Sequence, residues 1–411
     1  MRILLTVTGA WGTGSFQVAE GVADTLVDLG HEVKIFFPDA GMESSDRAHF
    51  YSRQDRYSIW SFPIQNEEAR LETFPLILTD PNPRSLYAKT FKQLSAAERS
   101  LYFGLLKEAL GKVIQDFKPD VIECQHIWAM DHVVGSMGLP FISVAHNSDQ
   151  LAFDYDETMR DITRQSATCA QYIFAISDPV RKRVIELYGV KPEKVITIPA
   201  GYSEDVFKPM DLDRSEILKQ FNLPDFKASD TVISFAGKLS KTKGVDTLLE
   251  AVYLLPDDVH TLVMGSGQLE AVLTPAEIDK LCSERVYFLG HLPLDQVALI
   301  DNISDLAVIP SRSEGFCIAG LEVLACGTPL IMTQGAHAGS YVVEEEVPTA
   351  DPVALAEAIK RFLSRPDADK KAASDRALVS AGQFSWKALV EERLSYYQLV
   401  IDTQGSVADK L

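Results

Sequence analysis

Short apolar runs alternate with longer helical stretches along the first half of the chain. Each run is rich in Val, Ile, Leu or Phe, which is typical of a strand buried on both faces. The runs expected to form strands are residues 3–8, 33–37, 121–124, 141–145 and 172–176. The stretches expected to form helices include 16–29, 101–117 and 179–188. Strands that alternate with helices predict a parallel, doubly wound sheet.

The second half of the chain repeats this pattern. Its expected strands are residues 231–236, 260–264, 286–289, 306–309 and 329–332. Pro and Gly cluster in 198–209, between the last strand of one half and the first of the next. We therefore predict an α/β protein with two Rossmann-like domains, 1–203 and 204–386. Ligands of such sheets bind beyond the carboxyl ends of the strands, so we expect a site between two facing sheets.

Residues 39–100 are the least regular part of the first half. Aromatic side chains are scattered there among polar residues and prolines. They could form the wall of a pocket that binds an acceptor molecule. Aromatic side chains more often belong to the hydrophobic core, and we expect this for most of them.

Composition narrows the class of protein. With 411 residues the chain is long enough for two domains, and its hydrophobic and charged shares are those of a globular protein. A formal charge of −19 argues against nucleic acid or an anionic membrane as the main partner. No apolar run is long enough for an integral membrane segment, and residues 1–8 are too short a start for a signal peptide. The five cysteines lack metal-type spacing, which fits a cytoplasmic protein.

Two glutamates, Glu314 and Glu322, lie eight positions apart around a loop that opens an apolar helix, which we expect over 316–325. Backbone N–H groups at a helix start attract an anion, and carboxylates accept hydrogen bonds from sugar hydroxyls. Glu314 could instead only offset the helix dipole, and Glu322 could be a solvated residue. Because the rest of that helix is apolar, we expect Glu322 to have a ligand or a cation.

A lysine-bearing loop follows the expected strand 231–236. Lys238 and Lys243 lie between Gly237 and Gly244. There they could neutralise the negative charge that develops on a nucleoside diphosphate as it leaves, and no metal would be required. A solvated turn is the alternative. Gly265, in Gly-Ser-Gly after strand 260–264, is a weaker phosphate-loop signal.

In the first half, His126 and His146 each follow a strand, where a histidine can donate to a sugar hydroxyl or move a proton. A lone histidine is more often structural. The N–H groups of Gly12, Thr13 and Gly14 precede a helix and could meet the reacting group, or could simply form a tight turn. The pair Asp154 and Asp156 has the Asp-x-Asp spacing of a metal site but falls in a polar stretch, which we interpret as a solvated loop.

Five elements in this order resemble the retaining glycosyltransferases of family 4, which have the GT-B fold. They are Gly12-Thr-Gly14, His146 after a strand, Pro199-Ala-Gly201 leading to Asp205-Val-Phe207, the Gly237–Gly244 lysine loop, and Glu314-Gly-Phe…Leu-Glu322. The tail after Phe384-Ser-Trp386 resembles the closing helix of that family, which crosses back onto the first domain. We therefore expect the helix within 387–411 to pack on the N-terminal, acceptor-binding domain, and 204–386 to bind the donor.

The resemblance implies roles for these residues. Glu322 would bind the ribose of a nucleoside-diphosphate sugar (UDP, GDP or ADP), and Glu314 with the N–H groups of Gly315, Phe316 and Cys317 would hold the transferred sugar. Lys238 and Lys243 would lie on the diphosphate, with Gly12, Thr13, Gly14, Gly237 and Gly265 lining the donor. His146 would contact the sugar at the reacting centre, so the residues expected to be catalytic are His146, Glu314, Lys238 and Lys243.

It further implies retained anomeric configuration, no cofactor and no metal. Apart from the resemblance, we expect the acceptor to be a small-molecule, saccharide or lipid-linked hydroxyl compound, with Trp11, His126 and Trp128 as candidate contacts. We expect the enzyme to be a monomer or homodimer.

The sequence departs from that family at three places. Lys238 stands where arginine is usual, Cys317 stands where glycine is usual, and the stretch 340–351 is shorter. Two alternatives stay open. A nicotinamide-dependent oxidoreductase would use Gly12, Gly14 and Asp39, although Gly9-x-x-Gly12-x-Gly14 is not the Gly-x-Gly-x-x-Gly pattern. A sugar-binding protein without turnover could keep the same fold.

Overall fold

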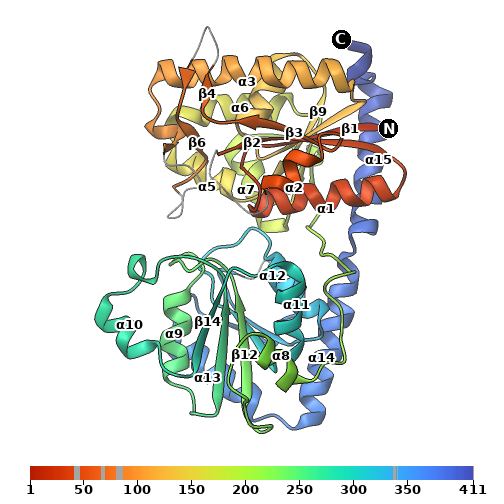
Figure 1. Ribbon diagram of the computed structural model, residues 1–411. Coiled ribbons are helices and arrows are strands. Elements are labelled where there is room, and N and C mark those ends of the chain that lie inside the picture. The colour runs from red at the N-terminus through yellow and green to blue at the C-terminus, as the bar shows by residue number, and fades with distance from the viewer. Residues whose placement is uncertain (41–46, 66–69, 80–86, 337–338, 340, 411) are drawn as a thin grey trace. The chain divides into compact units, whose positions relative to one another are not determined.

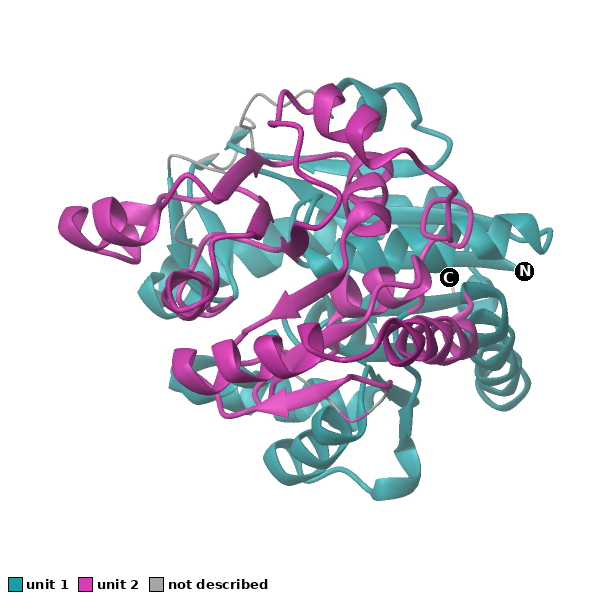
Figure 2. Cartoon of the chain, turned by 90° about the horizontal axis from the view of Figure 1, so that it is seen from below, with its two compact units in different colours: residues 1–200, 386–411 teal, residues 201–385 magenta. Residues whose placement is uncertain are grey.

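The computed structural model describes residues 1–40, 47–65, 70–79, 87–336, 339 and 341–410. The chain divides into two compact units (Figure 2). Unit 1 comprises residues 1–200 and 386–411, and unit 2 comprises residues 201–385. No helix in the described part of the chain has both the length and the apolar character that a membrane span requires.

Unit 1 is built on a seven-stranded parallel sheet with the strand order β11-β10-β9-β8-β1-β2-β3 (Figure 1). Its strands are β1 (Arg2–Val7), β2 (Glu32–Asp39), β3 (Tyr57–Ser61), β8 (Val121–Gln125), β9 (Phe141–Ala145), β10 (Tyr172–Ala175) and β11 (Val195–Thr197). The five strands predicted for this half are confirmed. The two outermost strands, β3 and β11, were not predicted.

The helices of unit 1 cover both faces of the sheet (Figure 1). They are α1 (Gly14–Asp28), α2 (Arg47–Ser52), α3 (Ala96–Phe117), α4 (Ala129–Ser136), α5 (Ser148–Tyr155), α6 (Arg160–Cys169), α7 (Asp178–Tyr188) and α15 (Trp386–Gln404). Local sequence sets their ends. Ser95 and Glu98 form a capping box at the start of α3, and Gly189 ends α7 in the left-handed conformation.

Most of the described aromatic side chains in the irregular region after β2 belong to the core, as predicted. Trp60, Phe62, Phe74 and Phe91 are buried, whereas Tyr87 is exposed. The region contributes the edge strand β3 and four short strands, β4 (Ile64–Gln65), β5 (Arg70–Leu71), β6 (Phe74–Leu76) and β7 (Ala88–Thr90), which pair as β4-β5 and β6-β7.

Helix α15 packs on unit 1, against α1 and β8. Trp386 at its start lies directly over Gly21 of α1, where any side chain would collide with the indole ring. Further along, Arg393, Tyr397 and Val400 are fully buried.

Unit 2 is built on a six-stranded parallel sheet with the order β14-β13-β12-β15-β16-β17. Its strands are β12 (Thr231–Ala236), β13 (Val259–Met264), β14 (Val286–Gly290), β15 (Leu306–Ile309), β16 (Leu330–Thr333) and β17 (Glu345–Val347). The five predicted strands are confirmed. The sixth, β17, lies in the short stretch 340–351, of which residue 340 is outside the described residues.

The helices of unit 2 also cover both faces of its sheet. They are α8 (Arg214–Gln220), α9 (Val245–Tyr253), α10 (Pro275–Leu281), α11 (Leu294–Ile303), α12 (Ile318–Ala325), α13 (Pro352–Leu363) and α14 (Asp367–Ala381). Figure 1 shows α9 and α13 on one face and α11 and α12 on the other. The core under α9 and α13 is mostly aliphatic, with Ile233, Leu248, Val263 and Ile359 fully buried.

Candidate active site

Two loops of unit 2 lie side by side because the strands before them are neighbours. β12 pairs with β15, so the lysine loop 237–244 and the glutamate loop 310–317 both leave the carboxyl edge of the sheet. Arg312 N donates to Thr242 O at 2.7 Å, which joins the loops directly. This edge is where parallel α/β sheets bind ligands.

Lys243 and Glu314 form an ion pair across these loops. Lys243 Nζ lies 2.6 Å from Glu314 Oε1, and the two side chains are 33% and 12% exposed. Burial acts to lower the pKa of Lys243, but the neighbouring charge of Glu314 outweighs it and the net pKa is raised. The lysine therefore stays charged next to the carboxylate, and the structure brings together two residues that the sequence places 71 positions apart.

Arg312 holds the lysine loop in place through its side chain. The sequence did not identify it as a site residue. Its guanidinium makes two hydrogen bonds to Asp246, of 2.8 and 2.9 Å, and also donates to the carbonyl of Lys241. Its position inside Pro-Ser-Arg-Ser-Glu, opposite an acid at the start of α9, is the signal that could have identified it. Such bidentate pairs fix geometry as well as charge.

Glycines allow the backbone segments to approach closely at this edge. Gly244 has φ 72°, and a Cβ there would overlap the carbonyl of Pro310. Gly265 has φ 141° and lies against the carbonyl of Gly237, whose N–H donates to Met264 O at 2.9 Å. Lys238, in the same lysine loop, is exposed.

Helix α12 begins at Ile318, two residues later than predicted. Phe316 and Cys317 stay in the loop because Cys317 is extended, with φ −84° and ψ 94°. Its side chain makes no cap hydrogen bond to the helix start, and its carbonyl accepts a 2.8 Å bond from Tyr341 OH. Burial and the charge of Glu314 raise the pKa of the Cys317 thiol to about 12, so it stays protonated near neutral pH.

Glu322 is partly buried on α12 and has an acidic neighbour. Burial, and secondarily the charge of Asp301, raise its pKa to about 8. Asp301 on α11 is 1% exposed; burial raises its pKa to about 7, although Ser234 Oγ donates to it at 2.9 Å. The expectation that Glu322 has a ligand or a cation stays a prediction. Its predicted setting is apolar, and the neighbour the structure supplies is a second acid.

In unit 1, His126 and His146 lie at the ends of the paired strands β8 and β9, with ring centroids 4.9 Å apart. His146 Nε2 lies 2.6 Å from Gln125 Oε1, and His126 Nε2 lies 2.9 Å from Ser148 Oγ. Burial lowers the pKa of His126 to about 4, and burial with the charges of His126 and Arg393 lowers that of His146 well below its usual range. Both rings are therefore neutral near pH 7.

Backbone strain accompanies the two histidines. His126 has φ 75° and Asn147, next to His146, has φ 70°, in the left-handed region that non-glycine residues rarely adopt. Asp149 holds both turns together. It accepts from the N–H of His146 at 3.0 Å and from the N–H of Ile127 at 3.2 Å.

The first loop of unit 1 forms the tight strand-to-helix turn that was the simpler expectation. Gly12 has φ 70°, and Thr13 caps α1 by accepting from Phe16 N at 3.4 Å. Gly14 is the first residue of α1. Trp11 and Trp128 are buried, Trp128 completely, so neither presents a ring face to an acceptor in this structure.

The Asp154-x-Asp156 pair is not the solvated loop that the sequence suggested. Asp154 is exposed and pairs with Arg183, whereas Asp156 is 1% exposed and caps a helical turn by accepting from Thr158 N. The two acids thus have separate structural tasks. Among the described residues, no three or more His, Cys, Asp or Glu side chains are grouped to hold a metal ion.

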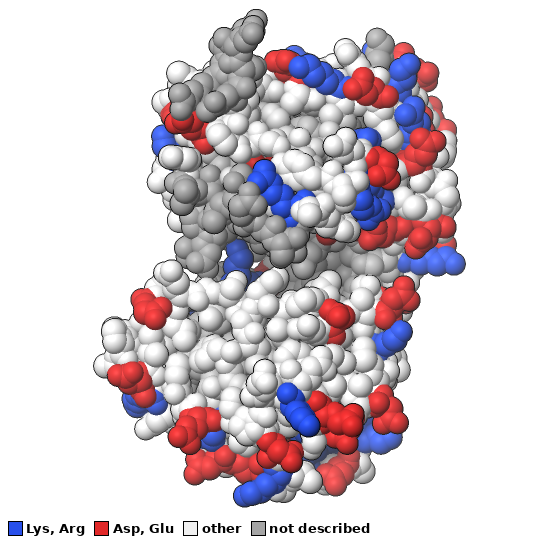
Figure 3. Space-filling model, in the orientation of Figure 1, with Lys and Arg blue, Asp and Glu red and all other residues white. Residues whose placement is uncertain are grey.

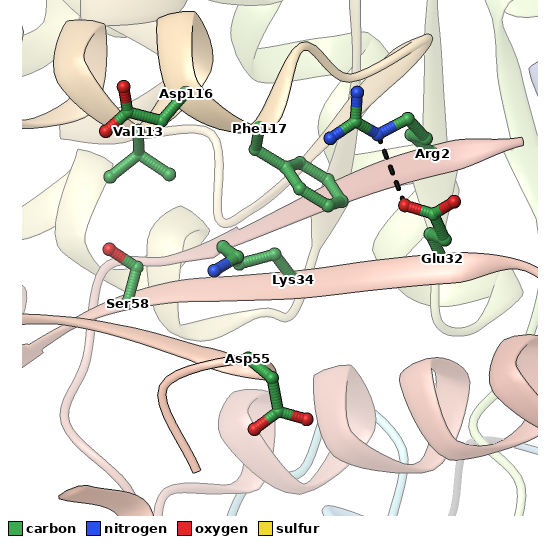
Figure 4. A pocket seen from close by; sticks show the side chains of 8 residues that line it. All are labelled: Arg2, Glu32, Lys34, Asp55, Ser58, Val113, Asp116 and Phe117. Carbon is green, nitrogen blue, oxygen red and sulfur yellow. Dashed lines mark ion pairs between the residues drawn. The ribbon is translucent and has the colours of Figure 1, made fainter.

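A cavity of about 370 Å³ lies at the opposite, amino-terminal edge of the unit 1 sheet (Figure 4). Arg2 and Lys34 line it, and both cations lie over the ring of Phe117. Arg2 also pairs with Glu32 at 3.3 Å. This mixed-charge cavity is far along the strands from both histidines. On the face drawn in Figure 3, described acidic and basic side chains are interspersed, without a continuous basic patch.

Comparison with known proteins finds two matching families. Residues 12–206 match the model described as "Glycosyltransferase Family 4", and residues 217–377 match "Glycosyl transferases group 1". A D-inositol 3-phosphate glycosyltransferase of Catenulispora acidiphila is 28% identical over 72% of this chain and 78% of its own length. One of Xylanimonas cellulosilytica is 27% identical over 52% of this chain, and the match spans only about half, 53%, of that protein.

Solved structures show the same fold at lower identity. Sucrose-phosphate synthase from Thermosynechococcus elongatus has a TM-score of 0.74 at 18% identity, over 98% of this chain and 100% of its own. Anabaena HepE in complex with UDP and glucose has a TM-score of 0.73 at 17% identity, over 97% and 99%. The two parallel-sheet α/β units are those of the GT-B fold.

Proposed function

Because this chain belongs to the group 1 glycosyltransferases, we propose that it moves a hexose-type sugar from a nucleoside-diphosphate sugar to a hydroxyl acceptor, with retained configuration and without a metal. The observation that carries the donor half is the Lys243–Glu314 pair at the carboxyl edge of the unit 2 sheet. It places a cation and a carboxylate in contact at the start of α12.

The ion pair suits a ligand that carries both a diphosphate and a sugar. Lys243 can turn from Glu314 to the phosphate oxygens, and Glu314 is then available to a sugar hydroxyl. We assign the N–H groups of Gly315, Phe316 and Cys317, in the loop that leads into α12, to the same ligand. Lys238 adds a second positive charge at the rim of the loop. These cations do the work that a divalent metal does in other transferases.

Glu322 is assigned to the ribose of the donor. An ionised carboxylate accepts two hydroxyl hydrogen bonds, and the cost of keeping Glu322 charged beside Asp301 is offset only when such donors are present. Donor binding therefore favours the ionised form of a group whose pKa is about 8 in the ligand-free protein.

His146 is assigned to the reacting sugar, and unit 1 to the acceptor. The ring is neutral near pH 7, so it contributes a hydrogen bond rather than a charge. D-Inositol 3-phosphate, which the names of relatives contain, is the first acceptor to test, and UDP-glucose the first donor, since HepE was solved with it. The nicotinamide alternative is set aside, because the family is that of a transferase. Its candidate Asp39 is buried and paired with Arg47 and Tyr51.

The test compares two lysines of one loop. Lys243→Met removes the cation of the ion pair, and Lys241→Met removes an exposed charge two residues away whose side chain has no role in the proposal. We expect Lys243→Met to lower kcat by about 10²–10³-fold, the cost of losing one transition-state donor, while Lys241→Met stays within a few-fold of wild type.

The assay is release of nucleoside diphosphate from UDP-, GDP- or ADP-glucose in the presence of the acceptor, with EDTA added to one series. Equal rates for the two variants would show that Lys243 is not part of the site. A rate that EDTA abolishes and Mg²⁺ restores would contradict the metal-independent mechanism.

A further inference from the structure

A buried carboxylate lies at the centre of unit 1 and connects the last helix of the chain to His146. Glu123 on β8 is completely buried, and ionised groups are rarely buried unless they are paired. Its Oε2 accepts from Arg393 Nη1 at 2.8 Å and from Tyr397 OH at 2.6 Å, both on α15. Arg393 and Tyr397 are four residues apart and therefore lie on one face of that helix.

The other oxygen of Glu123 fixes the orientation of an amide. Glu123 Oε1 accepts from Gln125 Nε2 at 2.7 Å. Because an ionised carboxylate can only accept, the NH₂ group of Gln125 must face it, and the amide oxygen must point the other way. That oxygen lies 2.6 Å from His146 Nε2.

The amide in turn fixes the proton on the imidazole. An amide oxygen can only accept, so His146 must carry its proton on Nε2, and Nδ1 of the neutral ring keeps its lone pair. A flipped amide would put its oxygen against the carboxylate of Glu123. Arg393 and Tyr397 oppose that flip indirectly, because both donate to the carboxylate of Glu123 and hold it in place.

We propose that Gln125, Glu123 and the α15 residues Arg393 and Tyr397 are positioning residues that hold His146 as the Nε2–H tautomer. This inference rests on the proposed role of His146 at the reacting sugar. The returning helix is then part of the catalytic apparatus of unit 1, although none of its residues touches the substrate. The other tautomer would leave the ring in place but make Nδ1 a hydrogen-bond donor instead of an acceptor.

The test uses Gln125→Met, which removes the amide but leaves the Glu123, Arg393 and Tyr397 cluster intact, so that the fold is retained. Tyr397→Phe removes one donor to Glu123, and Tyr396→Phe is its matched control, since Tyr396 packs on Tyr172 and Phe174 without touching Glu123. The tautomer is measured by long-range ¹H–¹⁵N NMR of histidine-labelled enzyme, with His146 identified by the signal missing in His146→Ala.

We expect wild type to show His146 protonated on Nε2, and Gln125→Met to show a mixture of tautomers with kcat at least about 10-fold lower and an unchanged KM for the donor. Tyr397→Phe should also lower kcat, whereas Tyr396→Phe should leave kcat unchanged. A wild-type ring protonated on Nδ1, or a Gln125→Met ring still wholly Nε2–H, overturns the proposal.

The NMR result does not depend on activity. If His146→Ala leaves sugar transfer unchanged, the proposed role of His146 fails, while the tautomer measured in wild type still decides whether Glu123 and α15 set it.

Discussion

Glu322→Gln should make unit 2 more stable at alkaline pH while it weakens donor binding. The pKa of Glu322 is raised from 4.5 to about 8 by burial and by Asp301. The folded protein therefore binds the proton more tightly than the unfolded chain, so the stability contributed by protonated Glu322 is fully present below pH 4.5 and is lost as the pH rises through 8. Glutamine has no proton to lose.

The size of the effect follows from the same pKa. At about 1.4 kcal/mol for each tenfold change in proton affinity, the ionised form is disfavoured on folding by about 5 kcal/mol. Because Glu322 is only partly buried, water screens its charge, and we expect Glu322→Gln to gain about 2 kcal/mol at pH 9 and roughly half of that at pH 6. pH 6 also keeps the protein away from its isoelectric point of about 4.9.

Urea unfolding followed by far-UV circular dichroism at pH 6, 7, 8 and 9 measures this difference. All four tryptophans, Trp11, Trp60, Trp128 and Trp386, belong to unit 1, so their fluorescence follows the other unit and should not change. Glu250→Gln, on the exposed side of α9, controls for the loss of one negative charge. The reasoning is refuted if the gain is the same at pH 6 and pH 9, or if the control gains as much.

Two further changes test how the site loops are held. Arg312→Lys should lower the free energy of unfolding of unit 2 by about 1–2 kcal/mol, since lysine cannot replace the two hydrogen bonds to Asp246; unchanged stability in the same urea assay would show that the clamp is unimportant. Gly244→Ala should cost more than about 2 kcal/mol, because the added Cβ meets the carbonyl of Pro310 in addition to the backbone strain. Gly30 is the control, because its φ of 84° is similar and a Cβ there would meet no neighbouring atom. Gly30→Ala should therefore lower stability by only about 1 kcal/mol. Equal losses for the two variants would mean that the contact with Pro310 does not matter.

Periodicity and residue type were enough to predict the central strands. Those buried on both faces, such as β8 and β12, are short apolar runs that have no other stable location. The edge strands β3 and β17 were missed because their sequences, Tyr-Ser-Ile-Trp-Ser and Glu-Glu-Val, contain polar residues that an edge tolerates. Their place in the sheet depends on neighbours that are distant in sequence.

The sequence named candidate site residues one by one but did not predict the contacts between them. The position of Lys243 and Glu314 after strands indicated that both lie at one edge, but strand order decides that they touch. Asp301 and Gln125 escaped notice for a related reason. Asp301 lies in α11 and Gln125 is the last residue of β8, and only the tertiary packing puts them beside Glu322 and His146.

Unit 1 is made from two stretches of chain that the ribosome releases far apart in time. Residues 1–200 emerge first, then all of unit 2, and only afterwards the helix that carries Arg393. Until then Glu123 lacks both of the donors that α15 supplies, Arg393 and Tyr397. Unit 2 is one continuous stretch of chain, so it needs no later segment to complete its fold. Unit 2 is therefore complete before unit 1, although the synthesis of unit 1 begins first. A chain that ends before Arg393 would have a complete unit 2 and an incomplete unit 1.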